Sequence, residues 1–178
     1  VFDEVLHKYY ADGRELPSVT TIIRRVLGDS GHGTQWHMDR GIAAHGLYAL
    51  MGAGEDLGLY DYDQRLTGNV AAWLDWHSRE RVEVEAVEKQ MCHMGAGYAG
   101  TVDAVVTIRG KRWIIDYKAS ASARDELQLA AYKELWEHNH PRQKIDGIAS
   151  LQITADGWKY GATLERIGLL SARAKWNA

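Results

Sequence analysis

Two apolar segments joined by a short turn constrain the fold of this chain more than any other part of its sequence. Residues 101–108 (TVDAVVTI) and 113–118 (WIIDYK) have the Val, Ile and aromatic content of strands, and the RGKR turn between them predicts a β-hairpin. Polar residues interrupt the apolar pattern at Asp103, Asp116 and Lys118. Burial of a charged side chain is costly unless it is paired. These three residues therefore indicate a functional site.

The register of the hairpin decides whether the polar residues meet. Asp116 and Lys118 are two positions apart and so lie on the same side of a strand. A four-residue turn centred between Gly110 and Lys111 would pair Asp103 with Lys118. Asp103 would then be diagonal to Asp116, at about 7–8 Å by backbone. A turn of odd length would instead direct Asp103 to the opposite face.

Two carboxylates and a lysine on one face suit the hydrolysis of a phosphate ester. Carboxylates in a partly desolvated cleft repel each other, and a divalent cation relieves the repulsion. Oxygen ligands favour Mg²⁺ or Mn²⁺, which lowers the pKa of a bound water. Lys118 could orient that water or stabilise negative charge in the transition state. The alternative interpretation of Asp116 and Lys118 is a salt bridge on an exposed strand face.

The segments around the hairpin predict an α/β fold with a central mixed β-sheet and flanking helices. We expect one domain over residues 1–178, with a helical N-terminal part (1–81) and a sheet-containing catalytic core (82–178). Ser18 is a plausible N-cap of the first helix. The apolar spacing predicts that the first helix buries Ile22, Ile23, Val26 and Leu27, and that the second buries Trp36, Ala43, Leu47 and Leu50. We expect helices near residues 18–28, 35–51, 64–81 and 123–138, further strands at 82–87, 145–154 and 158–164, and a weakly helical tail from residue 166.

Composition excludes several classes of protein. Hydrophobic residues make up 46% and charged residues 25% of the chain, which is typical of a globular domain. No apolar run is long enough to span a membrane and the N-terminus has no signal pattern, so we expect a cytoplasmic protein. Cys92 is the only cysteine, which excludes an internal disulfide, a four-cysteine iron–sulfur cluster and a cysteine-built zinc site. The net charge of −3 gives no basic footprint for nucleic acid, although metal ions can offset an acidic site.

Three motifs follow one another along the chain: GTVD at 100–103, DYK at 116–118 and QLAAY at 128–132. Upstream of them lie PSVTTI at 17–22 and RGIAAH at 40–45. Together these motifs resemble the RecB-type branch of the PD-(D/E)xK nucleases. That branch includes the nuclease domain of RecB, its CRISPR-associated relatives and many phage exonucleases. The resemblance implies a restriction-endonuclease-like core preceded by a helical segment.

The resemblance also implies a role for each matching residue. The metal ligands would be His45, Asp103, Asp116 and the carbonyl of Tyr117, and Lys118 would be the catalytic lysine. Gln128 and Tyr132 would line the DNA-facing edge of the cleft. An acidic residue on the preceding strand would complete the site, and we favour Glu85 over the alternative, Glu88. The cofactor would be Mg²⁺ or Mn²⁺, without an iron–sulfur cluster.

These observations lead us to expect a metal-dependent DNA exonuclease that acts in phage or bacterial recombination, repair or replication. One compact domain offers no separate module for reading a base sequence, which favours action on DNA ends. Tyr98, Tyr117 and Tyr132 suit stacking on single-stranded DNA, although aromatic residues at these positions are equally consistent with core packing. The alternatives are a catalytically silent DNA-binding module, a structure-specific endonuclease, or a subunit that depends on a helicase, polymerase or annealing protein. No P-loop motif is present, so ATP-driven unwinding would need a separate protein.

Overall fold

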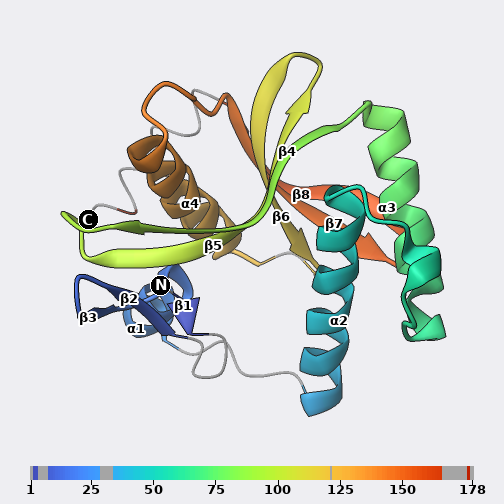
Figure 1. The fold of residues 1–178 in the computed structure, drawn as a ribbon, viewed down its shortest axis with the longest axis horizontal. Helices are drawn as coiled ribbons and strands as arrows, with labels where there is room; N and C mark the ends of the chain where they lie inside the picture. Colours follow the sequence, from blue (N-terminus) through green and yellow to red (C-terminus); the bar gives the residue numbers. More distant parts are fainter. Residues whose placement is uncertain (1, 4–7, 29–33, 121, 166–175, 177–178) are drawn as a thin grey trace.

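The computed structural model describes residues 2–3, 8–28, 34–120, 122–165 and 176. Five strands form a mixed sheet in the order β4-β5-β6-β7-β8, in which only β6 and β7 are parallel (Figure 1). The elements are β1 (Phe2–Asp3), β2 (Lys8–Ala11), β3 (Arg14–Leu16), α1 (Val19–Leu27), α2 (Gln35–Gly52), 3-10 turns at Leu57–Leu59 and Gln64–Leu66, α3 (Thr67–Glu80), β4 (Glu83–His93), β5 (Tyr98–Ile108), β6 (Lys111–Lys118), α4 (Asp125–Asn139), β7 (Gly147–Thr154) and β8 (Gly157–Glu165). The α/β prediction with a mixed sheet and flanking helices is confirmed.

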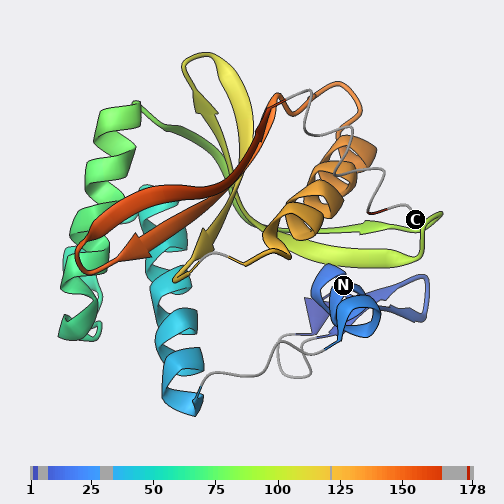
Figure 2. The same cartoon turned by 180° about the vertical axis from the view of Figure 1, so that it is seen from behind.

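Helices cover both sides of the sheet. Trp73 and Trp76 of α3 pack with α2 against one side, and Val19 of α1 packs with Leu129 and Leu135 of α4 against the other. Figures 1 and 2 show α1 and α4 together on one side of the sheet and α2 and α3 on the other. None of the helices in the part of the chain that the structure describes is both long and apolar enough to cross a membrane.

The N-terminal part was expected to be helical, but it also contains strands. A small antiparallel sheet, in the order β1-β2-β3, precedes α1. Its strands contain two to four residues each, which is too short for a period-two pattern to be visible in the sequence. The weakly helical tail expected from residue 166 lies almost wholly outside the described residues.

Two of the predicted helix faces differ from the structure. The predicted cap of α1 is confirmed, because the Thr21 amide donates to Ser18 Oγ at 3.0 Å. However, Val26 is 73% exposed, and α1 buries Val19 and Ile23 instead. In α2, Trp36 is 46% exposed because the first turns of the helix project beyond the sheet (Figure 1). Four residues that were predicted to be buried are exposed: Val26, Leu27, Trp36 and Ala43. The residues that α2 buries are Ala44, Leu47 and Tyr48.

The hairpin turn is shorter than predicted. It consists of Arg109 and Gly110, with φ of 52° and 74°, and cross-strand pairing starts on either side of them. Two successive left-handed residues match the twist of the flanking strands, so this turn is preferred to the four-residue one. Continuing the register puts Asp103 opposite Asp116 and not opposite Lys118. A shift of two residues preserves the side on which each residue lies, and the acids still converge.

The sheet divides at the two aspartates. The pairing of β5 with β6 ends at Ala104 and Ile115; beyond this point β5 pairs with β4 alone and β6 with β7 alone. Asp103 and Asp116 lie at the start of the opening. The Tyr117 amide donates to Asp103 Oδ2 at 2.9 Å in place of a backbone acceptor on β5. We call this point, where β5 and β6 separate at Asp103 and Asp116, the fork. The fork makes room for polar side chains inside an otherwise apolar sheet.

One buried hydrogen bond beside the fork leads to a prediction about stability. Trp73 Nε1 donates to the Tyr117 hydroxyl at 3.1 Å, and both side chains are fully buried. We expect Tyr117→Phe to lower the free energy of unfolding by about 1–3 kcal/mol, because the indole N–H loses its acceptor. Urea unfolding measures the difference. The matched variant is Tyr160→Phe, which removes the partner of Trp76 Nε1 at 3.0 Å; Trp76 is buried too, but Tyr160 is only half-buried, so water can replace its hydroxyl and we expect a smaller loss. Equal losses in the two variants would contradict the role of burial.

Candidate active site

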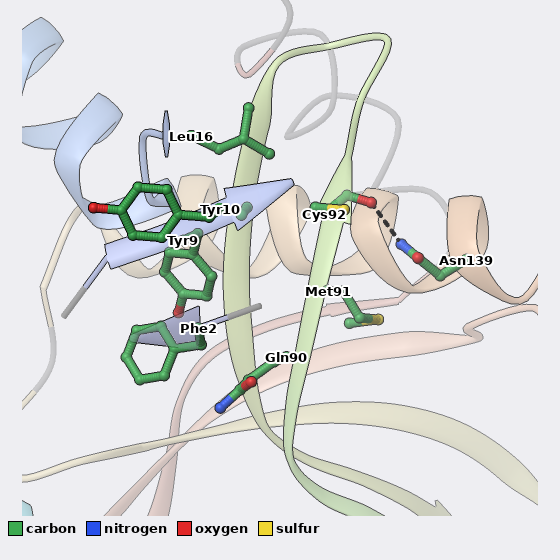
Figure 3. Close-up of a pocket in the computed structure, with 9 residues that line it drawn as sticks. Phe2, Tyr9, Tyr10, Leu16, Gln90, Met91, Cys92 and Asn139 are labelled. Atoms are coloured by element: carbon green, nitrogen blue, oxygen red, sulfur yellow. Dashed lines mark hydrogen bonds between the residues drawn. The ribbon is translucent and has the colours of Figure 1, made fainter. Parts of the chain in front are cut away.

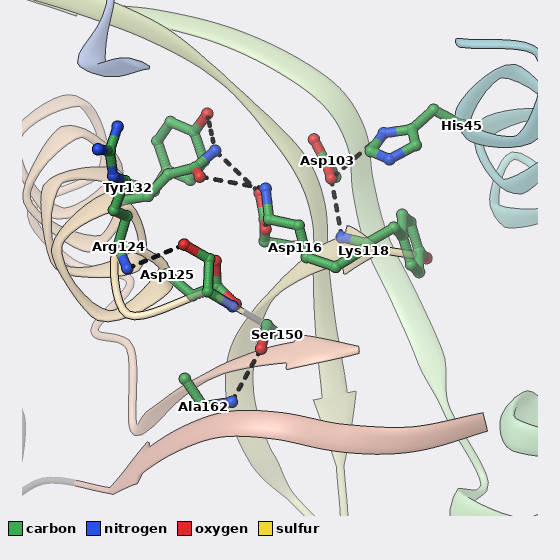
Figure 4. Close-up of polar contacts among 12 residues, drawn as sticks. His45, Asp103, Asp116, Lys118, Arg124, Asp125, Tyr132, Ser150 and Ala162 are labelled. Carbon is green, nitrogen blue, oxygen red and sulfur yellow. Dashed lines mark hydrogen bonds and ion pairs between the residues drawn. The ribbon is translucent and has the colours of Figure 1, made fainter. Parts of the chain in front are cut away.

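Five elements direct polar side chains into the fork. α2 supplies His45, β4 supplies Glu88, β5 supplies Asp103, β6 supplies Asp116 and Lys118, and α4 supplies Gln128 and Tyr132. Figure 4 shows His45 directed at Asp103 from one side and Tyr132 approaching from the opposite side. Residues separated by more than 80 positions in the sequence therefore meet at the point where the sheet divides.

Three of these side chains have the spacing of a metal site. His45, Glu88 and Asp103 each offer one ligand atom, and these atoms lie within 4.8 Å of one another. His45 Nδ1 is 3.5 Å from Asp103 Oδ2, and the His45 ring also forms a hydrogen bond with the backbone of Tyr117. Two carboxylates, an imidazole and a nearby backbone carbonyl are ligands for a divalent cation such as Mn²⁺ or Mg²⁺. The donor set therefore fits the metal that the sequence predicted.

Both aspartates are costly to ionise without a cation. Asp103 is 9% exposed and Asp116 is 1% exposed. Burial raises the pKa of Asp103 to about 7, although the charge of Lys118 opposes this. Burial also raises the pKa of Asp116 to about 7, with a further contribution from the charge of Asp103. One lysine does not compensate two buried carboxylates, and a divalent cation would supply the missing positive charge.

Lys118 is held in place by Asp116 and Gln128. Its Nζ lies 2.7 Å from Asp116 Oδ2 and donates to Gln128 Oε1 at 3.1 Å. The Gln128 amide in turn donates to Asp116 Oδ1 at 3.1 Å and to the Tyr132 hydroxyl at 2.9 Å. Burial opposes the charge of Lys118, but Asp116 and Asp103 outweigh it and raise the pKa. Lys118 is therefore a fixed cation next to Asp116.

Tyr132 does not lie at the edge of the cleft, in contrast to the expectation, whereas Gln128 is half-buried and contacts Lys118 and Asp116. Tyr132 is 5% exposed and packs in the core between α1, α4 and the sheet. Its hydroxyl reaches the site through Gln128. Tyr98 and Tyr117, at 3% and 2% exposed, are also buried, so of the two interpretations of these three rings the structure supports core packing and contradicts stacking on DNA. The residue type alone did not distinguish a core aromatic from a surface one.

Glu85, the favoured additional acid, lies outside the site. Its carboxylate lies 2.8 Å from Arg112 Nε and accepts from the Thr107 hydroxyl at 2.6 Å. These contacts link Glu85 to the part of β5 and β6 nearest the hairpin turn. The structure therefore corrects the preference for Glu85.

Glu88, the alternative, lies in the site because of two irregularities in β4. The register of β4 shifts between Val84 and Ala86, and Glu88 has a left-handed backbone with φ of 45°. The residues before and after Glu88 pair with the residues on either side of Asp103, so Glu88 lies opposite Asp103. Burial, and then the charge of Asp116, raise the pKa of Glu88.

The raised pKa values predict how cation binding depends on pH. We expect the affinity for Mn²⁺ to fall as the pH drops below about 7, because protons then compete for Asp103 and Asp116. Burial lowers the pKa of His45, which favours the neutral imidazole that can bind a cation. Calorimetric titration at pH 6, 7 and 8, in buffers of different ionisation enthalpy, measures the affinity and the protons released. Constant affinity over this range would contradict the prediction, and Asp103→Asn should reduce the proton release.

Comparison with known proteins identifies the family. The family model of the PD-(D/E)XK nuclease superfamily matches residues 34–165, which is more than half of the chain and contains every residue of the fork described above. No curated protein is significantly similar in sequence. The crystal structure of SSO0001 aligns with 89% of this chain and 83% of its own, at 14% identity and a TM-score of 0.33. The chain has the ligand group of a divalent-metal site at the fork. Because the family model matches more than half of it, the chain belongs to the PD-(D/E)XK nuclease superfamily, whose members are divalent-metal nucleases.

Proposed function

We propose that this protein is a metal-dependent DNA exonuclease of the RecB-type or phage exonuclease branch. The observation that supports this most directly is the group of His45, Glu88 and Asp103 next to the ion pair of Asp116 and Lys118. A cation site beside a fixed ammonium suits the hydrolysis of a phosphodiester, in which negative charge accumulates on the phosphate.

Each group at the fork has a distinct part in this proposal. His45, Glu88, Asp103 and the Tyr117 carbonyl would hold the cation, with Asp116 as a further ligand. When bound, the cation would lower the pKa of a coordinated water and offset the charge of the phosphate. Lys118 would donate to a phosphate oxygen; since it stays protonated, it cannot accept the proton of the attacking water. Gln128 would position both Asp116 and Lys118.

The motifs at 100–103, 116–118 and 128–132 support the assignment to the RecB-type branch. They also support a role in phage or bacterial DNA recombination, repair or replication, in the cytoplasm. DNA ends would be the substrate, and a helicase, polymerase or annealing protein would be a suitable partner.

Cleavage of end-labelled DNA tests the proposal. The substrates are linear single- and double-stranded DNA with 5′ or 3′ label and a closed circle, each in Mg²⁺, Mn²⁺ or EDTA. We expect metal-dependent loss of linear DNA that spares the circle and is absent in Asp116→Asn. Cutting of the circle would indicate an endonuclease. Binding without cleavage would indicate a silent or partner-dependent module.

A further inference from the structure

A pocket separates the small N-terminal sheet from the strands that carry the metal site. Its volume is about 210 Å³. Figure 3 shows Phe2 and Tyr9 of the small sheet on one side of the pocket and Gln90 and Cys92 of β4 on the other. The mechanism proposed above uses none of these residues.

Tyr9 connects the pocket to the metal site. Its hydroxyl is 2.7 Å from Thr101 Oγ1, and Thr101 precedes Asp103 by two residues on β5. Gln90 pairs with Thr101, just as Glu88 stands opposite Asp103. Two residues of a strand span about 6.8 Å. The pocket is therefore one step along the strand pair from the metal ligands.

The carboxylates of the metal group also act on Tyr9. Burial raises the pKa of Tyr9, and the charges of Glu88 and Asp103 add to the increase. The hydroxyl of Tyr9 is thus close enough to sense both carboxylates of the metal group.

The chemistry of the pocket suits a flat, uncharged ligand. None of its lining residues is charged, and the rings of Phe2 and Tyr9, which pack against each other 4.7 Å apart at 40°, form one of its walls. The Asn139 amide is already bonded to the carbonyl of Cys92, whereas the Gln90 amide has no hydrogen-bond partner among the described residues. Aromatic surface with one exposed amide at its edge matches the face and edge of a nucleobase.

We propose that this pocket receives an unpaired nucleobase of the substrate strand, within about two nucleotides of the scissile phosphate. The distance follows from the strand spacing, because the pocket lies only about 6.8 Å along β5 from Asp103. The inference rests on the proposed function and specifies which form of DNA the site binds. A base within a duplex must leave its partner before it can enter such a pocket. The pocket therefore selects single-stranded or frayed ends.

An abasic scan tests this inference without depending on catalysis. Single-stranded oligonucleotides that lack one base at successive positions are bound in EDTA at low salt, and fluorescence anisotropy measures the affinity. We expect one position, or two adjacent ones, to weaken binding by roughly 5- to 100-fold, which is the contribution of one stacked base. Tyr9→Leu should weaken binding of the intact oligonucleotide and lose this sensitivity. Tyr9→Phe should keep it, because the ring remains.

The controls separate stacking from a structural role. Tyr60→Leu alters an exposed tyrosine outside the pocket and should leave the abasic profile unchanged. An abasic profile that is flat in the parent protein would overturn the inference. So would a Tyr9→Leu variant that binds every oligonucleotide more weakly by the same factor and keeps the profile. If the profile is present but the parent cuts no DNA in Mg²⁺ or Mn²⁺, the pocket is supported and only the hydrolytic function fails.

Discussion

Asp116→Asn is expected to lower metal-dependent cleavage by at least about 10³-fold, since charge stabilisation by a bound cation contributes several kcal/mol. The amide keeps the shape of the side chain but removes the negative charge that pairs with Lys118 and would help to hold a cation. The release of nucleotides from linear DNA in Mg²⁺ measures the loss. Asp146→Asn is the matched control, because Asp146 is exposed and accepts only from the Arg112 amide. Cleavage within a few-fold of the parent would contradict the role of Asp116.

The same substitution should not destabilise the fold. Asp116 has a pKa of about 7 in the folded protein, against 3.8 for an unperturbed aspartate, so its ionised form is disfavoured on folding. This penalty is absent below the unfolded pKa, develops as the pH rises, and is complete above about 7. In EDTA at pH 8, we therefore expect the Tm of Asp116→Asn to equal or exceed that of the parent. A lower Tm would mean that the loss of cleavage reflects unfolding.

Lys118→Met separates the fixed ammonium from the cation. We expect cleavage to fall by roughly 10²–10³-fold, which is typical for the loss of one group that stabilises transition-state charge. Removing a positive charge beside the site should leave the Mn²⁺ affinity at pH 8.5 unchanged or tighter. A loss of Mn²⁺ binding would show instead that Lys118 holds the ligands in place.

The sequence predicted the arrangement of the site better than its register. The apolar pattern of 101–108 and 113–118 was sufficient to predict the hairpin. Asp103 and Asp116 lie on the same side of the sheet, as predicted, although the register differs by two residues. The turn length depended on left-handed φ values at Arg109 and Gly110, and arginine gives no signal for such a conformation. The fork, which results from the pairing of β6 with β7, was not predictable from local pattern.

Side-chain burial was the least predictable property. Tyr98, Tyr117 and Tyr132 belong to the cores on the two sides of the sheet, whereas Val26 and Trp36 are exposed. Amphipathic spacing shows that a helix has an apolar face, but the length of that face depends on the partner it covers. That partner is a tertiary feature.

Glu88→Gln and Glu85→Gln test the identity of the additional acid, and one strand supplies both the variant and its control. We expect Glu88→Gln to lower cleavage by about 10²-fold, because the cation loses one charged ligand. Glu85→Gln should leave cleavage within about twofold and lower the free energy of unfolding by less than about 1 kcal/mol, as expected for a partly exposed ion pair. Cleavage rates at saturating Mg²⁺, Mn²⁺ titration and urea unfolding measure the three effects.

The pair decides between two interpretations of the same run of acids. In an uninterrupted strand, Glu83 and Glu85 would alternate with buried residues. The sequence pattern would then not show whether Glu85 or Glu88 lies nearer the fork. The register shift at Ala86 and the left-handed backbone of Glu88 bring Glu88 opposite Asp103, and Glu85 remains with Arg112. If Glu85→Gln were the inactive variant, the acid of the metal site would follow the period-two pattern and not the bulge. Loss of both cleavage and Mn²⁺ binding in Glu88→Gln alone would show that the irregularity in β4 builds the site.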